Sequence, residues 1–149
     1  MTFLRAMIIG MLAIGALTLP SAAQTQSGVY KVALHVDDND VAKMNLTLNN
    51  VQNIINDFKK SGRKIEIEVV TYGPGLHMFR ADTSPVKARI EEIALANPNV
   101  TFSACGNTQS NMAKAEKKAI TLISEAKLVP SGIVHLVELQ RKGYAYVKP

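Results

Sequence analysis

The sequence predicts a single α/β domain built on a five-stranded, mainly parallel sheet with helices on both faces. Two observations lead to this prediction. From residue 29 onward, short runs rich in β-branched residues alternate with longer runs whose apolar residues recur every three or four positions. No repeat, low-complexity tract or linker divides residues 29–149. Strands that alternate with helices are typical of parallel sheets, because a parallel pair needs a long crossover connection, usually a helix.

The alternation places each element in turn. The predicted strands span residues 29–36, 64–72, 100–104, 128–129 and 144–147. The predicted helices span residues 41–60, 84–97, 108–124 and 133–142, and residues 76–83 form a loop or a short helical piece. Asn39 or Asp40 caps the first helix. In the second strand Glu66 and Glu68 alternate with apolar residues, which predicts an exposed face and a position nearer the sheet edge than the first strand.

The first 23 residues predict a secretory signal peptide that is not part of the fold. Arg5 supplies the positive start, residues 7–19 are uncharged and apolar, and small residues precede a cleavage between Ala23 and Gln24. The apolar run is shorter than the roughly 20 residues that a membrane-spanning helix needs. We therefore expect a periplasmic or secreted protein without a membrane anchor after processing, with a disordered lead-in over residues 24–28.

The formal net charge is +5, which raises the question of a nucleic-acid partner. A nucleic-acid-binding protein would interleave basic residues with exposed aromatic residues or carry a known reader motif, and this sequence does neither. Most of the basic residues that carry the excess fall on predicted helices, where they form a solvated face: Lys114, Lys117, Lys118, Arg141 and Lys142. We expect no nucleic-acid partner.

Polar residues and glycines follow three of the predicted strands. They are His35, Asp37 and Asp38 after the first strand; Tyr72, Gly73, Gly75 and His77 after the second; and Cys105, Gly106, Asn107 and Thr108 after the third. In an open parallel sheet, ligands bind where strands end and helices begin. These groups are therefore expected to share one rim of the sheet.

Cys105 is the only cysteine of the chain, and it lies just before a predicted helix start. Free backbone N–H groups and the positive end of the helix dipole there favour a thiolate. Gly106 would let the backbone approach a ligand of the sulfur, and Asn107 or Thr108 can cap the helix. The other interpretation is a small, buried apolar residue in the core. The residues alone leave both interpretations open.

The remaining polar residues narrow the chemistry. His77, in a Gly-Pro-Gly loop, is the histidine best placed to exchange a proton near Cys105, whereas His35 and His135 are expected to be packed. The acidic loop 37–40 has no glycine, so it offers no cradle for a cofactor phosphate. It does not match a calcium loop either, and there is no zinc spacing. We expect no cofactor and no metal.

The chain resembles the DsrE/DsrF-like sulfur-relay family, in its small exported branch. The resemblance covers most of residues 29–149. It lies in the strand that leads to Asp37-Asp38, the loop 72–75, the segment 102–108 around Cys105, and the tail segments 129–132 and 143–149. It implies a five-stranded α/β domain with flavodoxin-like layering that assembles into dimers, trimers or hexamers. It also implies a cysteine that accepts sulfane sulfur as a persulfide.

Two functions follow as expectations. The first is a sulfur carrier or sulfurtransferase that uses Cys105, assisted by His77. Gly73, Gly75, Gly106, Asn107 and Thr108 would bind the substrate, and a protein or a small sulfur compound would be donor and acceptor. The second is a non-catalytic, oligomeric protein that binds a small ligand and has a structural cysteine. Whether the protein is an enzyme is left open by the residues.

Overall fold

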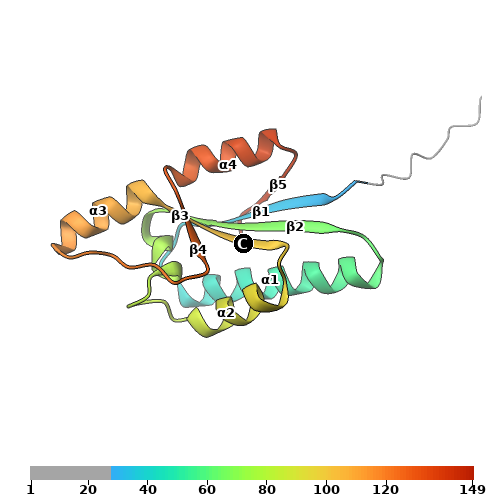
Figure 1. Ribbon diagram of the computed structural model, residues 1–149, viewed down its shortest axis with the longest axis horizontal. Coiled ribbons are helices and arrows are strands. Elements are labelled where there is room, and N and C mark those ends of the chain that lie inside the picture. The colour runs from blue at the N-terminus through green and yellow to red at the C-terminus, as the bar shows by residue number, and fades with distance from the viewer. Residues whose placement is uncertain (1–27) are drawn as a thin grey trace, which may run out of the picture.

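The computed structural model describes residues 28–149, and the signal peptide predicted for residues 1–23 lies outside them. A five-stranded sheet has the strand order β4-β3-β2-β1-β5, and all its neighbouring strands are parallel (Figure 1). The strands are β1 (Tyr30–Val36), β2 (Ile65–Thr71), β3 (Val100–Cys105), β4 (Ala126–Val129) and β5 (Ala145–Val147). The helices are α1 (Val41–Lys60), α2 (Lys87–Ala96), α3 (Gly106–Glu116) and α4 (Gly132–Arg141), with the 3-10 helix η1 (Gly73–Phe79). The predicted fold class is confirmed.

The strand order decides which helix covers which face. From β1 to β4 the chain steps across the sheet in one direction, and the last step returns from β4 to β5 at the opposite edge. Crossovers between parallel strands are right-handed, so a reversed step places its helix on the other face. Accordingly α1 and α2 pack on one face of the sheet and α4 on the other, while α3 extends from the carboxyl end of β3 (Figure 1).

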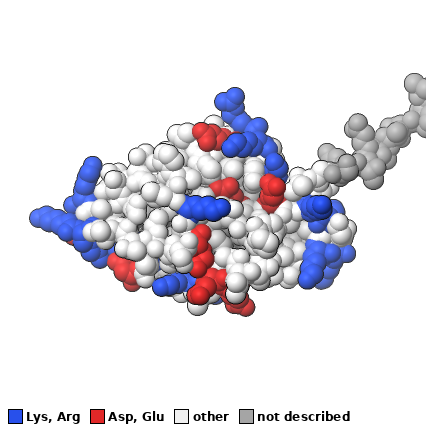
Figure 2. Space-filling model, viewed as in Figure 1, with Lys and Arg blue, Asp and Glu red and all other residues white. Residues whose placement is uncertain are grey.

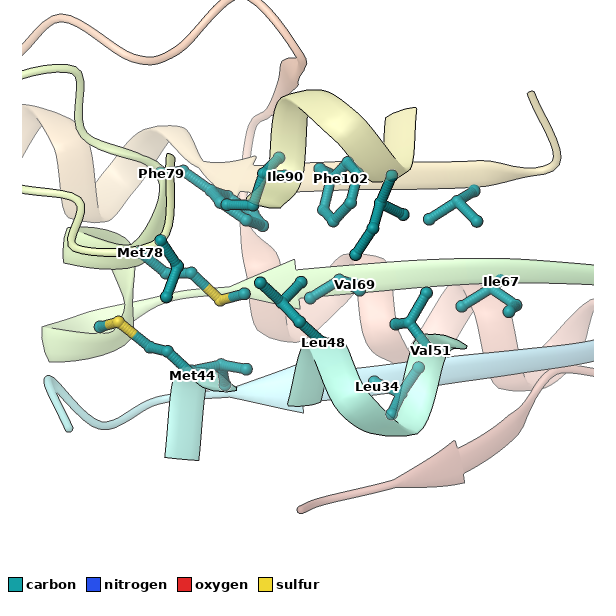
Figure 3. Close-up of a cluster of buried hydrophobic side chains, with 14 of the residues drawn as sticks. Leu34, Met44, Leu48, Val51, Ile67, Val69, Met78, Phe79, Ile90 and Phe102 are labelled. Carbon is teal, nitrogen blue, oxygen red and sulfur yellow. The ribbon is translucent and has the colours of Figure 1, made fainter. Parts of the chain in front are cut away.

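The main core lies between the sheet and the pair α1 and α2. Figure 3 shows Leu48 and Val51 of α1 directed toward Leu34 and Val69 of the central strands, with Phe102 beside them. The opposite face has a much smaller apolar cluster, formed by Ala33, Val70, Leu136 and Leu139. Polar groups occupy much of the space between the sheet and α4, so the two faces of the sheet differ in character.

The prediction that the second strand lies near the sheet edge is wrong, because β2 is the middle strand. Of its glutamates, Glu68 is covered by α4, whereas the side chain of Glu66 is 45% exposed. Glu68 is only 9% exposed and contacts Ser103 and His135. Glu66 accepts a hydrogen bond from the Tyr144 hydroxyl at 3.0 Å. In β2, glutamates that alternate with apolar residues therefore indicate a strand face with polar partners, and not a strand at the sheet edge.

The helix predicted over residues 108–124 is also partly wrong, because α3 begins at Gly106 and ends at Glu116. Lys117 has φ +52°, in the left-handed region, and this stops the helix. The chain then docks on the segment after η1: Ala81 N–H donates to Thr121 O at 2.8 Å, and Ile123 N–H donates to Phe79 O at 2.9 Å. The apolar residues of this stretch are used for docking and not for a helix face.

The other element boundaries differ little from those predicted. The main shift is in α2, which begins at Lys87 and not at Ser84. Within residues 28–149, none of the helices has the length and apolar character that crossing a membrane requires. On the face shown in Figure 2, basic side chains stand in separate groups with acidic side chains between them. The absence of a nucleic-acid partner stays a prediction.

Candidate functional site

Cys105 is the last residue of β3, and the next residue begins α3. Its side chain points to the face that α4 covers, where the start of α4 comes very close. A Cβ added to Gly132, the first residue of α4, would lie 3.1 Å from Cβ of Cys105 and 3.1 Å from Cβ of Tyr72. The absence of a side chain at Gly132 thus lets the N-terminus of α4 approach the sulfur. The sequence did not single out Gly132 as a site residue.

Two helix N-termini therefore converge on the Cys105 sulfur, and they change its acidity. Burial is the largest effect and raises the pKa of the thiol. The Thr108 side chain and backbone N–H groups at both helix starts act in the opposite direction: those of Gly132, Thr108 and Asn107. Their combined effect outweighs burial, and the pKa of Cys105 lies below its ordinary value. The site favours a thiolate.

The sulfur is also covered, since Cys105 is only 3% exposed. Gly106 contributes to the cover through packing. A Cβ at Gly106 would lie 3.2 Å from Val129 O, and Asn107 N–H donates to Pro130 O at 3.2 Å. The connection from β4 to α4 thus lies directly on the start of α3. Both interpretations made from the sequence apply in part, because the thiol is buried and its pKa is lowered.

Thr108 links the thiol to a pocket on the other side of α3. Its Oγ1 accepts a hydrogen bond from Gly73 N–H at 3.0 Å, which ties α3 to the start of η1. A pocket of about 440 Å³ lies beside this contact. It is lined by Asn39, Gly73, Pro74, His77, Thr108, Asn111, Met112 and Ala115. Thr108 thus lines the pocket, and its side chain also lowers the pKa of Cys105, whereas Cys105 itself is not part of the lining.

His77 lies in the wall of this pocket. Its Nδ1 is 2.9 Å from Oγ1 of Thr83, and no hydrogen bond within residues 28–149 joins it to Cys105. Gly75 has a packing role, because a Cβ there would lie 2.2 Å from Val36 O. Of the residues selected from the sequence, the structure brings Asn107 and Thr108 to the thiol, and Gly73 and His77 to the pocket.

His35 belongs to an aromatic group under the carboxyl rim. Its ring stacks on Tyr72 at a centroid distance of 4.4 Å, and its Nδ1 lies 2.8 Å from the Tyr146 hydroxyl. Burial lowers the pKa of His35, although nearby Asp37 raises it. Nε2 of His35 is buried without a hydrogen-bond partner in the described part of the chain. The prediction of a packed His35 agrees with this arrangement.

The acidic loop is occupied by contacts within the chain. Asp40 caps α1, as its Oδ1 accepts hydrogen bonds from Ala42 N–H at 2.7 Å and from the Lys43 N–H at 3.1 Å. Asp37 lies 2.6 Å from Lys148 Nζ, and Asp38 pairs with Lys43. Among residues 28–149, no group of three or more His, Cys, Asp or Glu side chains is arranged to hold a metal ion.

Comparison with known proteins fixes the family. The sequence profile described as the DsrE/DsrF-like family matches residues 24–149. The chain belongs to this family. The resemblance noted in the sequence around Cys105 and in the tail is thereby confirmed, and the family is one generally associated with sulfur relay.

A solved structure supports the fold of this DsrE/DsrF-like chain. It is that of a protein of unknown function from Methanobacterium thermoautotrophicum, with 32% sequence identity and a TM-score of 0.67. The match covers 80% of this chain and 99% of the other. No curated protein matches the sequence.

Proposed function

We propose that this protein is a sulfur carrier or sulfurtransferase that holds sulfane sulfur as a persulfide on Cys105. The observation that carries the proposal is the convergence of the α3 and α4 N-termini on the sulfur, which lowers the pKa of the thiol although it is buried. The thiolate is the nucleophilic form of cysteine. Membership of the DsrE/DsrF-like family supports sulfur as the transferred group.

The chemistry requires no redox cofactor. The Cys105 thiolate attacks the outer sulfur of a donor such as thiosulfate, and a new S–S bond forms. The bond between the donor's two sulfur atoms breaks, and its electron pair leaves with sulfite. The outer sulfur of the persulfide carries the negative charge, next to the sulfur at which the N–H groups of Asn107, Thr108 and Gly132 lower the thiol pKa. Attack by an acceptor thiolate on the outer sulfur regenerates the Cys105 thiolate.

The pocket beside Thr108 is the donor site in this proposal. Thr108 forms part of its wall and lowers the pKa of the thiol, while Gly73 and His77 lie in the same wall. Gly75 and Gly106 support the site through close backbone packing. Because Cys105 is 3% exposed, the β4–α4 connection or the pocket wall has to shift before a donor reaches the sulfur.

Mass spectrometry tests the proposal directly. After incubation with thiosulfate or polysulfide, the protein should gain the mass of one sulfur atom on Cys105, and dithiothreitol should remove it. Cys105→Ser is the matched control and should gain nothing. Absence of the adduct in a folded protein whose thiol reacts with a small alkylating reagent would sink the proposal.

Two further properties belong to the same proposal. The protein is exported to the periplasm or secreted, and it acts as a homo-oligomer. Sequencing of the N-terminus of the processed protein tests the first point, and it should begin at Gln24. An N-terminal residue other than Gln24, or an intact Met1 in the exported fraction, would contradict the predicted cleavage.

A second candidate function is supported by the burial of Cys105 and by its absence from the pocket lining. In this alternative the protein binds a small ligand in the pocket beside Thr108, and the cysteine is structural. Cys105→Ser would then bind the ligand as the wild type does, and the native thiol would react only slowly with a small reagent. Loss of binding on this substitution would contradict the alternative.

A further inference from the structure

A buried carboxylate lies under α4, at the centre of the sheet. Glu68 of β2 is only 9% exposed, and its Oε1 accepts a hydrogen bond from Ser103 Oγ at 2.5 Å. Nε2 of His135 lies 2.5 Å from the same Oε1, closer than in an ordinary N–H···O hydrogen bond. A buried carboxylate without partners is costly. Its two contacts therefore hold three elements together.

These elements are the ones that build the thiol site. Ser103 lies on β3 and faces the same side of the sheet as Cys105, two positions further on. His135 lies in the first turn of α4, where its N–H donates to Ser131 O at 2.9 Å. The same turn begins with Gly132, which touches Cys105. Glu68 thus links the start of α4 to the strand that carries the sulfur.

Apart from the close packing of Gly132 on Cys105 and Tyr72, the first turn of α4 has few other anchors. Leu136 and Leu139 bury the middle of the helix against Ala33 and Val70. In the first turn, by contrast, Ile133 is 54% exposed and Val134 is 53% exposed. The far end of α4 is fastened separately, through the Tyr144 hydroxyl and Glu66. His135 is therefore the side chain that fixes the N-terminal turn of α4 to the sheet.

We propose that Glu68, His135 and Ser103 form a positioning cluster that holds the N-terminus of α4 against the Cys105 sulfur. None of the three touches the reacting atoms, and each acts through the position of the Gly132 N–H. The proposal rests on the part of the proposed function that makes Cys105 a thiolate, and it does not depend on which sulfur donor is used.

The direction in which the thiolate fraction changes on replacement of Glu68 distinguishes a positioning role from a direct electrostatic effect. Glu68 and the thiolate carry the same charge, so removal of the carboxylate alone would favour the thiolate. Loss of positioning withdraws an N–H donor from the sulfur and disfavours the thiolate. Tyr72, which directly follows β2, is a titratable side chain close to Cys105, and it is unchanged in the variants below.

The experiment follows the ultraviolet absorbance of the thiolate in the full chain as a function of pH. Glu68→Ala and His135→Ala should each lower the thiolate-to-thiol ratio at a fixed pH about tenfold, the scale of one hydrogen bond to a charged group. Glu68→Gln keeps an acceptor oxygen for Ser103 and His135 and removes the negative charge, so its thiolate-to-thiol ratio should equal or exceed that of the wild type. Glu66→Ala is the matched control, because it unfastens the far end of α4 and should leave the ratio unchanged.

Circular dichroism establishes that each variant is folded. If Glu68→Ala does not fold, His135→Ala decides, because His135 lies nearer the surface with 19% of its side chain exposed. An unchanged or increased thiolate ratio in a folded His135→Ala protein overturns the positioning role. Sulfur uptake is measured separately. If the wild-type protein takes up no sulfur, the proposed function is refuted. A lower thiolate ratio in the variants would still support the positioning role.

Discussion

Gly132 affects both the packing of α4 against the sheet and the pKa of Cys105. If Gly132 carried a Cβ atom, that atom would lie only 3.1 Å from Cβ of Cys105. Side chains or backbone must move if that space is filled, and in a packed interior this costs stability. The same movement would withdraw the Gly132 N–H from the sulfur. Packing and acidity at this position should therefore change together.

Gly132→Ala should lower the free energy of unfolding by roughly 1–3 kcal/mol. It should also raise the pKa of Cys105, because one of the N–H donors leaves the sulfur. Urea unfolding and thiolate absorbance measure the two effects. Gly28→Ala is the control, since a Cβ at Gly28 meets nothing within 4 Å. A variant as stable as the wild type with the same thiolate fraction would contradict this account of Gly132.

Residue-level prediction from the sequence succeeded where the chain itself fixes the geometry. Cys105, Asn107 and Thr108 are adjacent in the chain, so a strand that runs into a helix places the N–H groups of α3 at the sulfur. Gly132 and His135 could not be assigned, because their roles depend on which sheet face α4 covers. That choice follows from the strand order, which residue spacing does not reveal.

At the scale of elements, the two ends of α1 were predictable and the end of α3 was not. Asp40 caps α1, and Gly62 follows its end with φ +65°, so both ends carry the usual signals. The end of α3 carries a lysine in the left-handed conformation, where glycine is favoured. A helical pattern continues past Lys117 in the sequence, but the left-handed Lys117 and the docking of the following chain on Phe79 and Ala81 end the helix.

Lys117→Gly should raise the free energy of unfolding by about 1 kcal/mol, because glycine adopts the left-handed conformation without steric cost. Chemical denaturation of the folded chain measures it. Lys118→Gly is the matched control: Lys118 contacts Asp82 and Glu116, so its replacement should give no gain. Equal stability changes in the two variants would count against strain at Lys117.

The end of α3 is also fastened by a buried guanidinium. Arg80 is 1% exposed and lies 2.5 Å from Glu116 and 2.8 Å from Asp82. Its hydrogen bond lowers the pKa of Glu116 from 4.5 to about 2. Because the unfolded chain regains the ordinary pKa, this contribution to stability is complete above about pH 4.5 and is lost as the pH falls toward 2.

Acid unfolding should reveal this contact. The free energy of unfolding should decrease as the pH falls from 4.5 toward 2, and the decrease should be smaller in Glu116→Gln, which has no carboxylate to protonate. Denaturant unfolding at a series of pH values measures both slopes. Equal slopes would show that Glu116 does not contribute to the acid sensitivity.

For the molecule as a whole, the two sheet faces have different tasks. The face under α1 and α2 holds the apolar core, whereas the face under α4 holds the thiol, the aromatic group around His35 and the Glu68 cluster. The alternation of strands and helices was enough to predict the sheet. The polar face was not predictable, because Glu68 and His135 are far apart in the sequence and either could have been solvated.

The proposed homo-oligomer belongs to the same scale. Light scattering coupled to size-exclusion chromatography should give the mass of a dimer, trimer or hexamer for the processed chain. A monomer at concentrations well above those in the cell would contradict this part of the proposal. The result would leave the sulfur chemistry untouched, because the two helix N-termini at Cys105 come from one chain.

The central claim is that the N-termini of α3 and α4 lower the pKa of the Cys105 thiol although it is buried. The most direct measurement is a pH titration of thiolate absorbance in the wild type, with the curve of Cys105→Ser subtracted to remove tyrosine ionisation. The account predicts a single transition below the ordinary thiol pKa of 9.0. A transition at or above that value would contradict it, and would leave Cys105 as a buried structural residue.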